Sequence, residues 1–345
     1  MKKIDYKSAG VDIDAGNKSV DLIKESVKST FSKNVLTGIG SFGSLYNLKN
    51  IIAEYENPIL VQSIDGVGTK TIIAHKMKKY DSIGIDLVSA CCNDITVMGA
   101  QPLTFLDYIA NDKLNPVIIR EIVDGMASAC RENDIALVGG ETAEMPDTYL
   151  PGEHDLVGVI TGIVDKKNII DGSKIYNGDV VLGLPSTGLQ TNGYSLARKL
   201  FFEIGQYDIS DTISGLDKSI GETLLKPSYI YNNYIQLLLQ NSVQINGMAH
   251  ISGGGLVENI PRILPSNYAV EIKKGSWPVL PVFKTMQKIG NIDETEMHRT
   301  FNMGIGMVLI VPAEQKQEIF STLRGKINVY EIGNVIHGKP KVSFA

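Results

Sequence analysis

The chain has 345 residues, of which 43% are hydrophobic and 21% charged. A chain of this length usually forms about two domains, each large enough for its own core. The formal net charge of −5 provides no basic surface, so nucleic acid is not expected as the main partner, whereas small phosphorylated ligands can still bind through local geometry.

The cysteine content and the terminal segments indicate a cytoplasmic protein. Three cysteines without a CxxC pair cannot form a disulfide framework or a typical zinc site. The segment "MKKIDYKSAG" lacks the apolar run of a signal peptide. The most apolar stretch, 303–311, is too short to cross a bilayer. We therefore expect no membrane association and reduced, buried thiols.

The first half alternates β-type runs with helical patterns. The second half repeats this mixture after the polar, glycine-containing segment 165–179, where we place the domain boundary. The expected strands are 58–64, 102–109, 135–140, 156–164, 180–184, 247–252, 269–272, 306–311 and 329–336. The expected helices are 20–30, 81–98, 116–133, one from Tyr194, 221–241 and one from Leu256. The predicted fold class is α/β, with two mixed α/β domains at 1–168 and 169–345; periodicity leaves the strand order open.

The segment "GIGSFG" at 38–43 matches the dinucleotide pattern GxGxxG letter for letter. That pattern needs a preceding strand and a following helix, and neither is evident here. A mobile glycine loop is the favoured interpretation, and a flap over a nucleotide remains open.

The segment "IDGVGTK" at 64–70 combines features that favour phosphate with one that opposes it. Gly66 and Gly68 allow a tight turn with exposed N–H groups, and Lys70 can neutralise phosphate. Asp65 would repel phosphate unless Mg²⁺ bridges the two. A hairpin turn with a solvated lysine is the alternative interpretation.

Two further carboxylates favour the metal interpretation. In the expected helix 81–98, Asp94 lies on the same side as Leu87 and Cys91. Burying a carboxylate among apolar side chains is costly unless it has an oppositely charged partner or binds a metal. Glu141 follows a β run through a Gly-Gly turn. Folding can bring the three acids together as a magnesium–nucleotide site. A structural salt bridge from Asp94 to a lysine at 76, 78 or 79 is the alternative.

Two loops in the second half have the order strand, Gly/Ser/Thr loop, helix: 183–199 and 250–261. Such loops present backbone N–H groups and hydroxyls at a helix N-terminus, which favours phosphate, although ordinary capping gives the same pattern. His250 is a candidate acid–base group or a core histidine.

These motifs together resemble the phosphoribosylformylglycinamidine cyclo-ligase family, also called aminoimidazole ribonucleotide synthetases. The resemblance runs nearly end to end. It includes "YKSAGVDIDAGN" (6–17), "DGVGTK" (65–70), "DSIGIDLVSACCNDI" (81–95), "FLDYIA" (105–110), "LVGGETAEMP" (137–146), "TNGYSLARK" (191–199), "AHISGGGLVENIPR" (249–262) and "FNMGIGM" (301–307).

The resemblance implies an N-terminal domain that binds ATP and metal and pairs in a homodimer with a barrel-like core. It implies a C-terminal domain, packed beside a groove, that binds the substrate phosphate. The implied reaction is ATP-dependent closure of formylglycinamidine ribonucleotide to 5-aminoimidazole ribonucleotide through phosphorylation of the formyl oxygen, in purine biosynthesis.

The implied site residues fall into four groups. Asp65, Asp94 and Glu141 would hold Mg²⁺, and Lys70, Asp65 and Asp94 would act in catalysis. The ATP contacts would come from Gly40, Gly43, Gly66, Gly68, Thr69, Lys70 and Asn93. The substrate contacts would come from Asn192, Gly193, His250, Ser252, Gly253, Gly254 and Gly255.

The chain departs from the family pattern at Gln190 and Thr191, where many members have histidine and serine, and at Ile64, where threonine is usual. A general-acid role at position 190 is therefore in doubt. Alternatives are a sister ATP user of the selenophosphate synthetase or thiamine-phosphate kinase kind, a dinucleotide-dependent oxidoreductase, and a non-catalytic homologue.

Overall fold

The computed structural model describes residues 4–345 and divides into two compact units. The first unit extends to Ile95 and resumes over Gln101–Lys167, and the second comprises Thr96–Ala100 and Asn168–Ala345. Each unit is built around one mixed β-sheet, so the predicted α/β class is confirmed.

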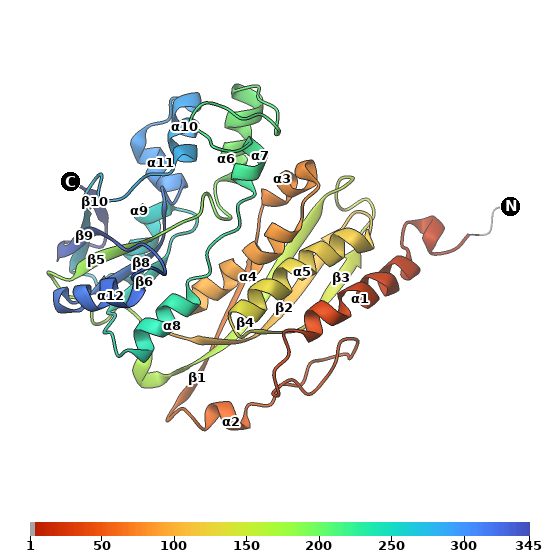
Figure 1. Cartoon of the computed structure of the whole chain (residues 1–345), viewed down its shortest axis with the longest axis horizontal. Coiled ribbons are helices and arrows are strands. Elements are labelled where there is room, and N and C mark those ends of the chain that lie inside the picture. The colour runs from red at the N-terminus through yellow and green to blue at the C-terminus, as the bar shows by residue number, and fades with distance from the viewer. Residues whose placement is uncertain (1–3) are drawn as a thin grey trace. The chain divides into compact units, whose positions relative to one another are not determined.

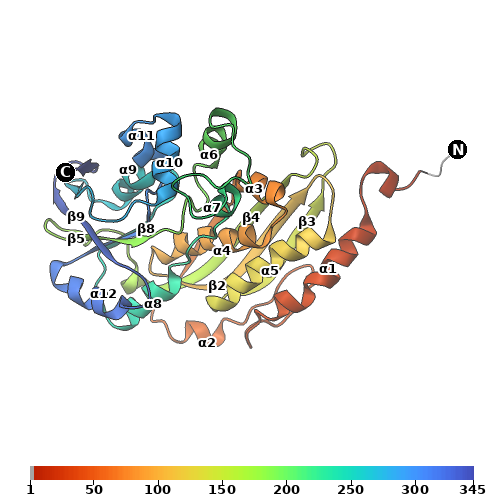
Figure 2. The same ribbon diagram turned by 45° about the horizontal axis from the view of Figure 1, so that its top comes forward.

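The first unit has a four-stranded sheet in the order β1-β4-β2-β3. Strand β4 runs antiparallel to both of its neighbours, and β2 runs parallel to β3. Helices α4 and α5 lie side by side over one face of this sheet, and α1 lies along α5 (Figures 1 and 2). The strands are β1 (Pro58–Gly66), β2 (Gln101–Asn111), β3 (Ala136–Glu144) and β4 (His154–Asp165). The helices are α1 (Ile13–Lys28), α2 (Lys49–Ile52), α3 (Lys70–Met77), α4 (Asp81–Thr96) and α5 (Pro116–Glu132).

Helices α4 and α5 approach each other closely because glycines lie at their contact. A Cβ atom on Gly84 would stand 2.0 Å from the Ile122 carbonyl oxygen, and one on Gly125 would stand 2.0 Å from that of Asp81. No real Cβ tolerates such contacts, so only glycine permits this packing. The apolar face predicted for 116–133 is buried against the sheet as expected.

The opposite face of the sheet carries exposed apolar side chains. Ile64 pairs with Val159, and Val159 pairs with Leu106, so the three lie in one row across the sheet. The exposed fractions are 66% for Ile64, 58% for Leu60 and 41% for Leu106. Large apolar side chains that stay in water on a sheet face are a recognised mark of an interaction surface.

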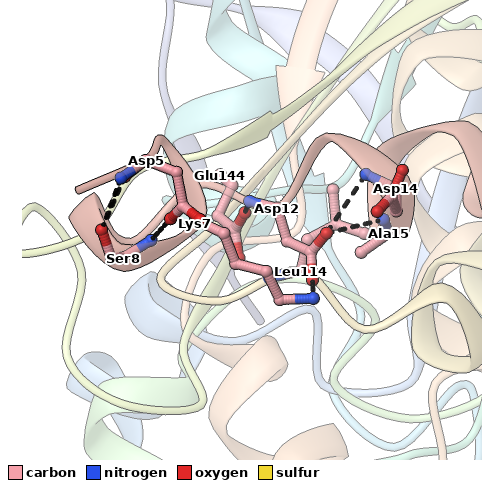
Figure 3. A network of polar contacts seen from close by, with 8 residues as sticks. All are labelled: Asp5, Lys7, Ser8, Asp12, Asp14, Ala15, Leu114 and Glu144. Atoms are coloured by element: carbon pink, nitrogen blue, oxygen red, sulfur yellow. Dashed lines mark hydrogen bonds and ion pairs between the residues drawn. The ribbon is translucent and has the colours of Figure 1, made fainter. Parts of the chain in front are cut away.

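The N-terminal segment is fastened to the end of β3 by Glu144 (Figure 3). One carboxylate oxygen of Glu144 accepts the Asp12 N–H at 2.5 Å, and the other accepts the Leu114 N–H at 2.9 Å. Asp12 also caps α1 and stands 2.6 Å from the Lys7 ammonium. The start of α1 is thereby tied to the strand that carries the "GGETAE" motif.

The second unit has a six-stranded sheet in the order β10-β7-β9-β5-β8-β6. Alternate residues of β5 and β8 enter two different apolar clusters, so both faces of the sheet are covered. The strands are β5 (Val180–Pro185), β6 (Gly247–His250), β7 (Tyr268–Ile272), β8 (Ile305–Val311), β9 (Tyr330–His337) and β10 (Val342–Phe344). The helices are α6 (Tyr194–Arg198), α7 (Ile220–Leu224), α8 (Asn232–Gln240), α9 (Gly255–Asn259), α10 (Pro281–Gly290), α11 (Glu294–Thr300) and α12 (Lys316–Leu323), with η3 (Lys199–Ile204) and η4 (Ile260–Ile263) following α6 and α9.

The prediction of one continuous helix over 221–241 is wrong. The structure has α7 and α8 with an irregular link that contains Pro227. Proline removes a backbone donor and clashes with the preceding turn, so the helical pattern is interrupted there. Among residues 4–345, no helix is long and apolar enough to cross a bilayer.

Candidate active site

Asp65 lies on β1, immediately before a glycine turn that leads into a helix. The chain leaves the strand at Gly66, turns through Gly68 at φ +54°, and enters α3 at Lys70. The segment is therefore strand, turn and helix rather than the alternative hairpin. Thr69 occupies the N-cap position of α3, so this turn has the geometry that presents backbone N–H groups to an anion.

Asp65 and Asp94 lie on the same face of the sheet. Asp94 extends from α4 and accepts a hydrogen bond from Ser63 Oγ at 3.2 Å, and Ser63 points to the same face as Asp65 because they are two residues apart on β1. Both carboxylates help to raise the pKa of the Cys91 thiol, after burial as the largest cause. The two acids therefore lie on one face of the sheet within one chain, and their joint metal role remains a prediction.

Glu141 does not join that pair within one chain. Glu141 on β3 pairs with Tyr108 on β2, Tyr108 pairs with Val157 on β4, and Val157 pairs with Gly66 on β1. Paired residues point to the same face, and Gly66 is the neighbour of Asp65 along the strand, so Glu141 points to the face opposite Asp65. Strand β3 is also three strand spacings from β1, about 14 Å. Within residues 4–345, no three His, Cys, Asp or Glu side chains are arranged to hold a metal. The metal role of Glu141 remains a prediction.

Asp107 is a further carboxylate, which the sequence motifs did not single out. It lies in a row with Asp65, Gly158 and Gly140 across the sheet. A Cβ on Gly140 would stand 2.3 Å from Asp107 Oδ1, so the glycine makes room for the carboxyl group. Asp107 lines a cavity of about 270 Å³ beside α1, and burial raises the pKa of its carboxyl to about 7. The sequence "FLDYIA" contained a signal for this residue. In a strand, side chains alternate between the two faces, so Asp107 shares the buried face with Phe105.

The Lys70 side chain is completely buried in this structure. Its ammonium stands 2.5 Å from the carboxylate of Asp86, which is also fully buried. Burial lowers the pKa of Lys70, although Asp86 opposes that shift. The ion pair joins α3 to α4, and a contact between Lys70 and ATP phosphates remains a prediction.

The remaining predicted nucleotide residues lie in two environments. Asn93 is buried in α4, where its side-chain amide donates to Ser89 Oγ at 3.2 Å. Gly40 and Gly43 lie in an exposed loop between α1 and α2, with Gly40 at φ +96°. Since no strand precedes this loop and no helix directly follows it, the structure does not support a dinucleotide-binding turn.

The two predicted substrate loops of the second unit meet. Asn192 Oδ1 lies 3.2 Å from the position that a Cβ on Gly253 would occupy. Gly193 and Gly254 are the N-cap residues of α6 and α9, both with positive φ. His250 ends β6 and is half-buried. The structure thus brings the "TNG" and "SGGG" segments side by side at two helix N-termini.

Asn259 shapes the glycine loop and was missed from the sequence. Its side-chain amide donates to the carbonyls of Gly253 at 3.1 Å and Gly255 at 2.9 Å. The Gln190 side-chain amide donates to the buried Tyr231 hydroxyl at 3.3 Å, and only 3% of the residue is exposed. A buried glutamine facing a tyrosine agrees with the doubt about a general acid at this position.

Comparison with known families decides the assignment. The profile described as "AIR synthase related protein, N-terminal domain" matches residues 50–164, and the corresponding C-terminal domain profile matches 177–344. A phosphoribosylformylglycinamidine cyclo-ligase of Syntrophotalea carbinolica is 52% identical over 348 aligned positions, covering 99% of both chains. The chain belongs to the phosphoribosylformylglycinamidine cyclo-ligase family. Another family member, from Citrifermentans bemidjiense, is 50% identical and covers 94% of this chain and 92% of its own.

Solved structures with low sequence identity share the fold. Thiamine-monophosphate kinase from Stenotrophomonas maltophilia superposes with a TM-score of 0.69 at 18% identity, covering 95% of each chain. Hydrogenase maturation protein HypE in complex with ATP gives a TM-score of 0.66 at 16% identity, covering 94% of this chain and 90% of the other. The family resemblance seen in the sequence is confirmed, and the chain is an enzyme of the cyclo-ligase type.

Proposed function

We propose that the enzyme closes formylglycinamidine ribonucleotide to 5-aminoimidazole ribonucleotide, with ATP converted to ADP and phosphate, in purine biosynthesis in the cytoplasm. The proposal rests chiefly on the 52% identity across 99% of the chain to a relative that carries the cyclo-ligase name. The paired carboxylates Asp65 and Asp94 beside a strand–turn–helix supply a site chemistry consistent with it.

The proposed chemistry has two steps. The formyl oxygen first receives the γ-phosphoryl group of ATP, because an amide oxygen is otherwise a poor leaving group. A substrate nitrogen then attacks that carbon, the ring closes, the nitrogen gives up its proton, and the carbon–oxygen bond breaks to release phosphate. Holding both ends of the substrate in one site makes the attack effectively unimolecular, and excluding water protects the activated intermediate.

Asp65 and Asp94 would hold Mg²⁺ together with ATP phosphates. Mg²⁺ is commonly bound by one or two carboxylates plus phosphate oxygens, so this pair fits without a third protein acid. The bound ion would neutralise charge on the transferring phosphoryl group. The Gly66–Gly68 turn would supply backbone N–H groups to the phosphates, with Lys70 and Thr69 beside it.

The second unit would bind the ribose phosphate of the substrate. Ser252, the three glycines that follow it, Asn192 and Gly193 would supply its contacts. This is supported by the approach of Asn192 to Gly253 and by the N-cap positions of Gly193 and Gly254. Backbone N–H groups at two helix N-termini favour a phosphate.

The first unit would also form the homodimer. The row of Ile64, Val159 and Leu106 belongs to the sheet face that α4 and α5 leave uncovered, and Ile64 and Leu106 are exposed there. Two such faces packed together would remove this apolar surface from water and enclose a barrel-like core.

The test is a two-channel assay with ATP, Mg²⁺ and formylglycinamidine ribonucleotide, following ADP release and diazotisable aminoimidazole. We expect one ADP per imidazole, and no turnover when Mg²⁺ is left out. ADP release without aminoimidazole formation would instead indicate a sister phosphotransferase. The absence of both products would reject catalysis by this chain.

A further inference from the structure

The segment "FNMG" at 301–304 joins α11 to β8 in the second unit. None of the nucleotide or substrate contacts proposed above involves it. Phe301, Asn302 and Met303 are all buried, so the polar side chain of Asn302 lies in the interior between two apolar neighbours. A buried amide needs partners for both its oxygen and its nitrogen, and these partners show what the residue holds in place.

The Asn302 side chain holds the first part of a predicted substrate loop. Its oxygen accepts the Ser186 hydroxyl at 2.8 Å and the Gly304 N–H at 2.9 Å, and its nitrogen donates to the Gly188 carbonyl at 2.8 Å. A backbone N–H can only donate and a carbonyl can only accept, so this orientation of the amide is fixed. Ser186 and Gly188 lie on the stretch of chain that leads directly into "TNG" at 191–193.

Phe301 lies against both predicted substrate loops. A Cβ on Gly193 would stand 2.3 Å from Phe301 Cε1, so the ring fills the space that glycine leaves there. A Cβ on Gly255 would stand 2.7 Å from the Phe301 carbonyl oxygen. The ring also packs against Phe283, with 5.7 Å between the ring centroids. One buried residue therefore contacts the "TNG" loop with its side chain and the "SGGG" loop with its backbone.

The backbone is strained on both sides of these contacts. Gln190 has φ +61° and Met303 has φ +51°, a left-handed conformation that residues with a side chain rarely adopt. The Met303 carbonyl is fixed by the Trp277 indole N–H at 2.9 Å. Strained residues persist where the surrounding contacts over-determine them, and they cluster at binding and active sites.

We propose that Asn302 and Phe301 are positioning residues for the substrate. Asn302 fixes the course of the loop 186–193, and Phe301 sets its spacing from the loop 252–255. Both side chains are buried, so they act through the loops and not on the substrate itself. This role depends on the proposed function, in which the two loops hold the ribose phosphate.

The experiment first measures binding without any reaction. Ribose 5-phosphate is titrated into the full chain labelled with ¹⁵N-glycine, and the amide signals of Gly193 and Gly254 report occupation of the loops. Asn302→Ala removes all three hydrogen bonds, so we expect the dissociation constant to rise about tenfold or more. Phe301→Leu removes ring atoms beside Gly193 and should act in the same direction, which keeps the test valid if Asn302→Ala fails to fold. Unmoved loop signals in the wild type, or wild-type affinity in the folded variants, would overturn the proposal.

Steady-state kinetics separates positioning from a purely structural role. Positioning should raise the KM for formylglycinamidine ribonucleotide about tenfold and leave the KM for ATP within about twofold of wild type. A structural role would lower the folded fraction, which reduces the apparent kcat and leaves both KM values unchanged. Leu323→Ala, at a fully buried position of α12, should show that second pattern. Ser186→Ala is the matched control, because it removes one hydroxyl and keeps the bond from Asn302 to Gly188.

Failure of the positioning role is distinguishable from failure of the proposed reaction. Ring closure by the wild type, with unchanged constants in both Asn302→Ala and Phe301→Leu, would reject positioning and keep the reaction. Binding of ribose 5-phosphate that these variants weaken, without ring closure by the wild type, would reject the reaction and keep the positioning role.

Discussion

The carboxyl group of Asp107 illustrates how position on a sheet sets the charge of one side chain. Burial raises its pKa to about 7, well above the value near 4 of an exposed aspartate. Between pH 4 and 7 the folded state therefore binds more protons than the unfolded state, so the free energy of unfolding falls as pH rises through this window. A difference of about three pKa units corresponds to a loss of about 4 kcal/mol at most.

Asp107→Asn should remove this dependence, because the amide is neutral at every pH. We expect the variant to be more stable than the wild type at pH 8 and similar to it near pH 4, in urea unfolding followed at both pH values. Asp155→Asn, at an exposed carboxylate of β4, serves as the control. Equal pH profiles for Asp107→Asn and the wild type would show that the carboxyl titrates normally.

Asp65 and Asp94 give the second prediction at this scale. Asp65→Asn and Asp94→Asn should each lower turnover by about a hundredfold or more, because each removes charge from the proposed magnesium site. They should also raise the Mg²⁺ concentration needed for half-maximal rate. Unfolding curves should stay close to wild type, and Glu54→Gln, at an exposed acid, should change nothing. Full activity in both aspartate variants would reject the metal assignment.

At the scale of elements, the buried Lys70–Asp86 pair joins α3 to α4. Lys70→Met should destabilise the fold by about 3–5 kcal/mol, because it leaves the Asp86 carboxylate buried without the Lys70 charge. The double variant Lys70→Met/Asp86→Leu should recover much of that loss in urea unfolding. A double variant no more stable than the single one would contradict this interpretation.

The same pair of variants tests the predicted phosphate role of Lys70. If the ammonium also contacts ATP, the KM for ATP should rise in Lys70→Met and stay raised in the double variant, although stability returns. If the lysine acts only between helices, the KM should recover together with stability. Comparing the two quantities therefore separates an interhelical role from a nucleotide contact.

Strand and helix patterns predicted the elements around the site better than they predicted its geometry. The runs that became β1, β2 and β4 were recognisable because apolar residues continue or alternate over their whole length. The interruption at Pro227 was missed although the proline itself was the available signal. The short helix α3 was missed because its eight residues show no amphipathic pattern. The position of Glu141 could not be foreseen, because which face a residue takes depends on the register of strands distant in the sequence.

Partners supplied from elsewhere in the fold were also invisible in the sequence. Lys70 appeared to be a solvated or phosphate-binding lysine, yet Asp86 holds it in the interior from sixteen positions away on another helix. Asn259 looked like an ordinary helix residue, although its amide holds two carbonyls of the glycine loop. The family resemblance is confirmed, but it carried no information about these contacts.

At the scale of the whole molecule, the uncovered face of the first sheet predicts the oligomeric state. Leu60 and Leu106 expose 58% and 41% of their surfaces there, and burying them against a second copy would stabilise a dimer. Leu60→Lys and Leu106→Lys should each shift the protein from dimer to monomer in light scattering coupled to gel filtration. Charged ammonium groups placed on the paired faces would otherwise have to be buried without partners.

The control for the dimer is Ile204→Lys, at an apolar side chain of the second unit that is 52% exposed. This variant should keep the wild-type mass, because the same charge is added to the second unit and not to the first sheet. Monomer formation should also follow dilution of the wild type, with the lysine variants dissociating at higher concentrations. A wild-type protein that is monomeric at every concentration would reject the interface. A dimer that survives both lysine substitutions would place the contact on a different surface from the row of Ile64, Val159 and Leu106.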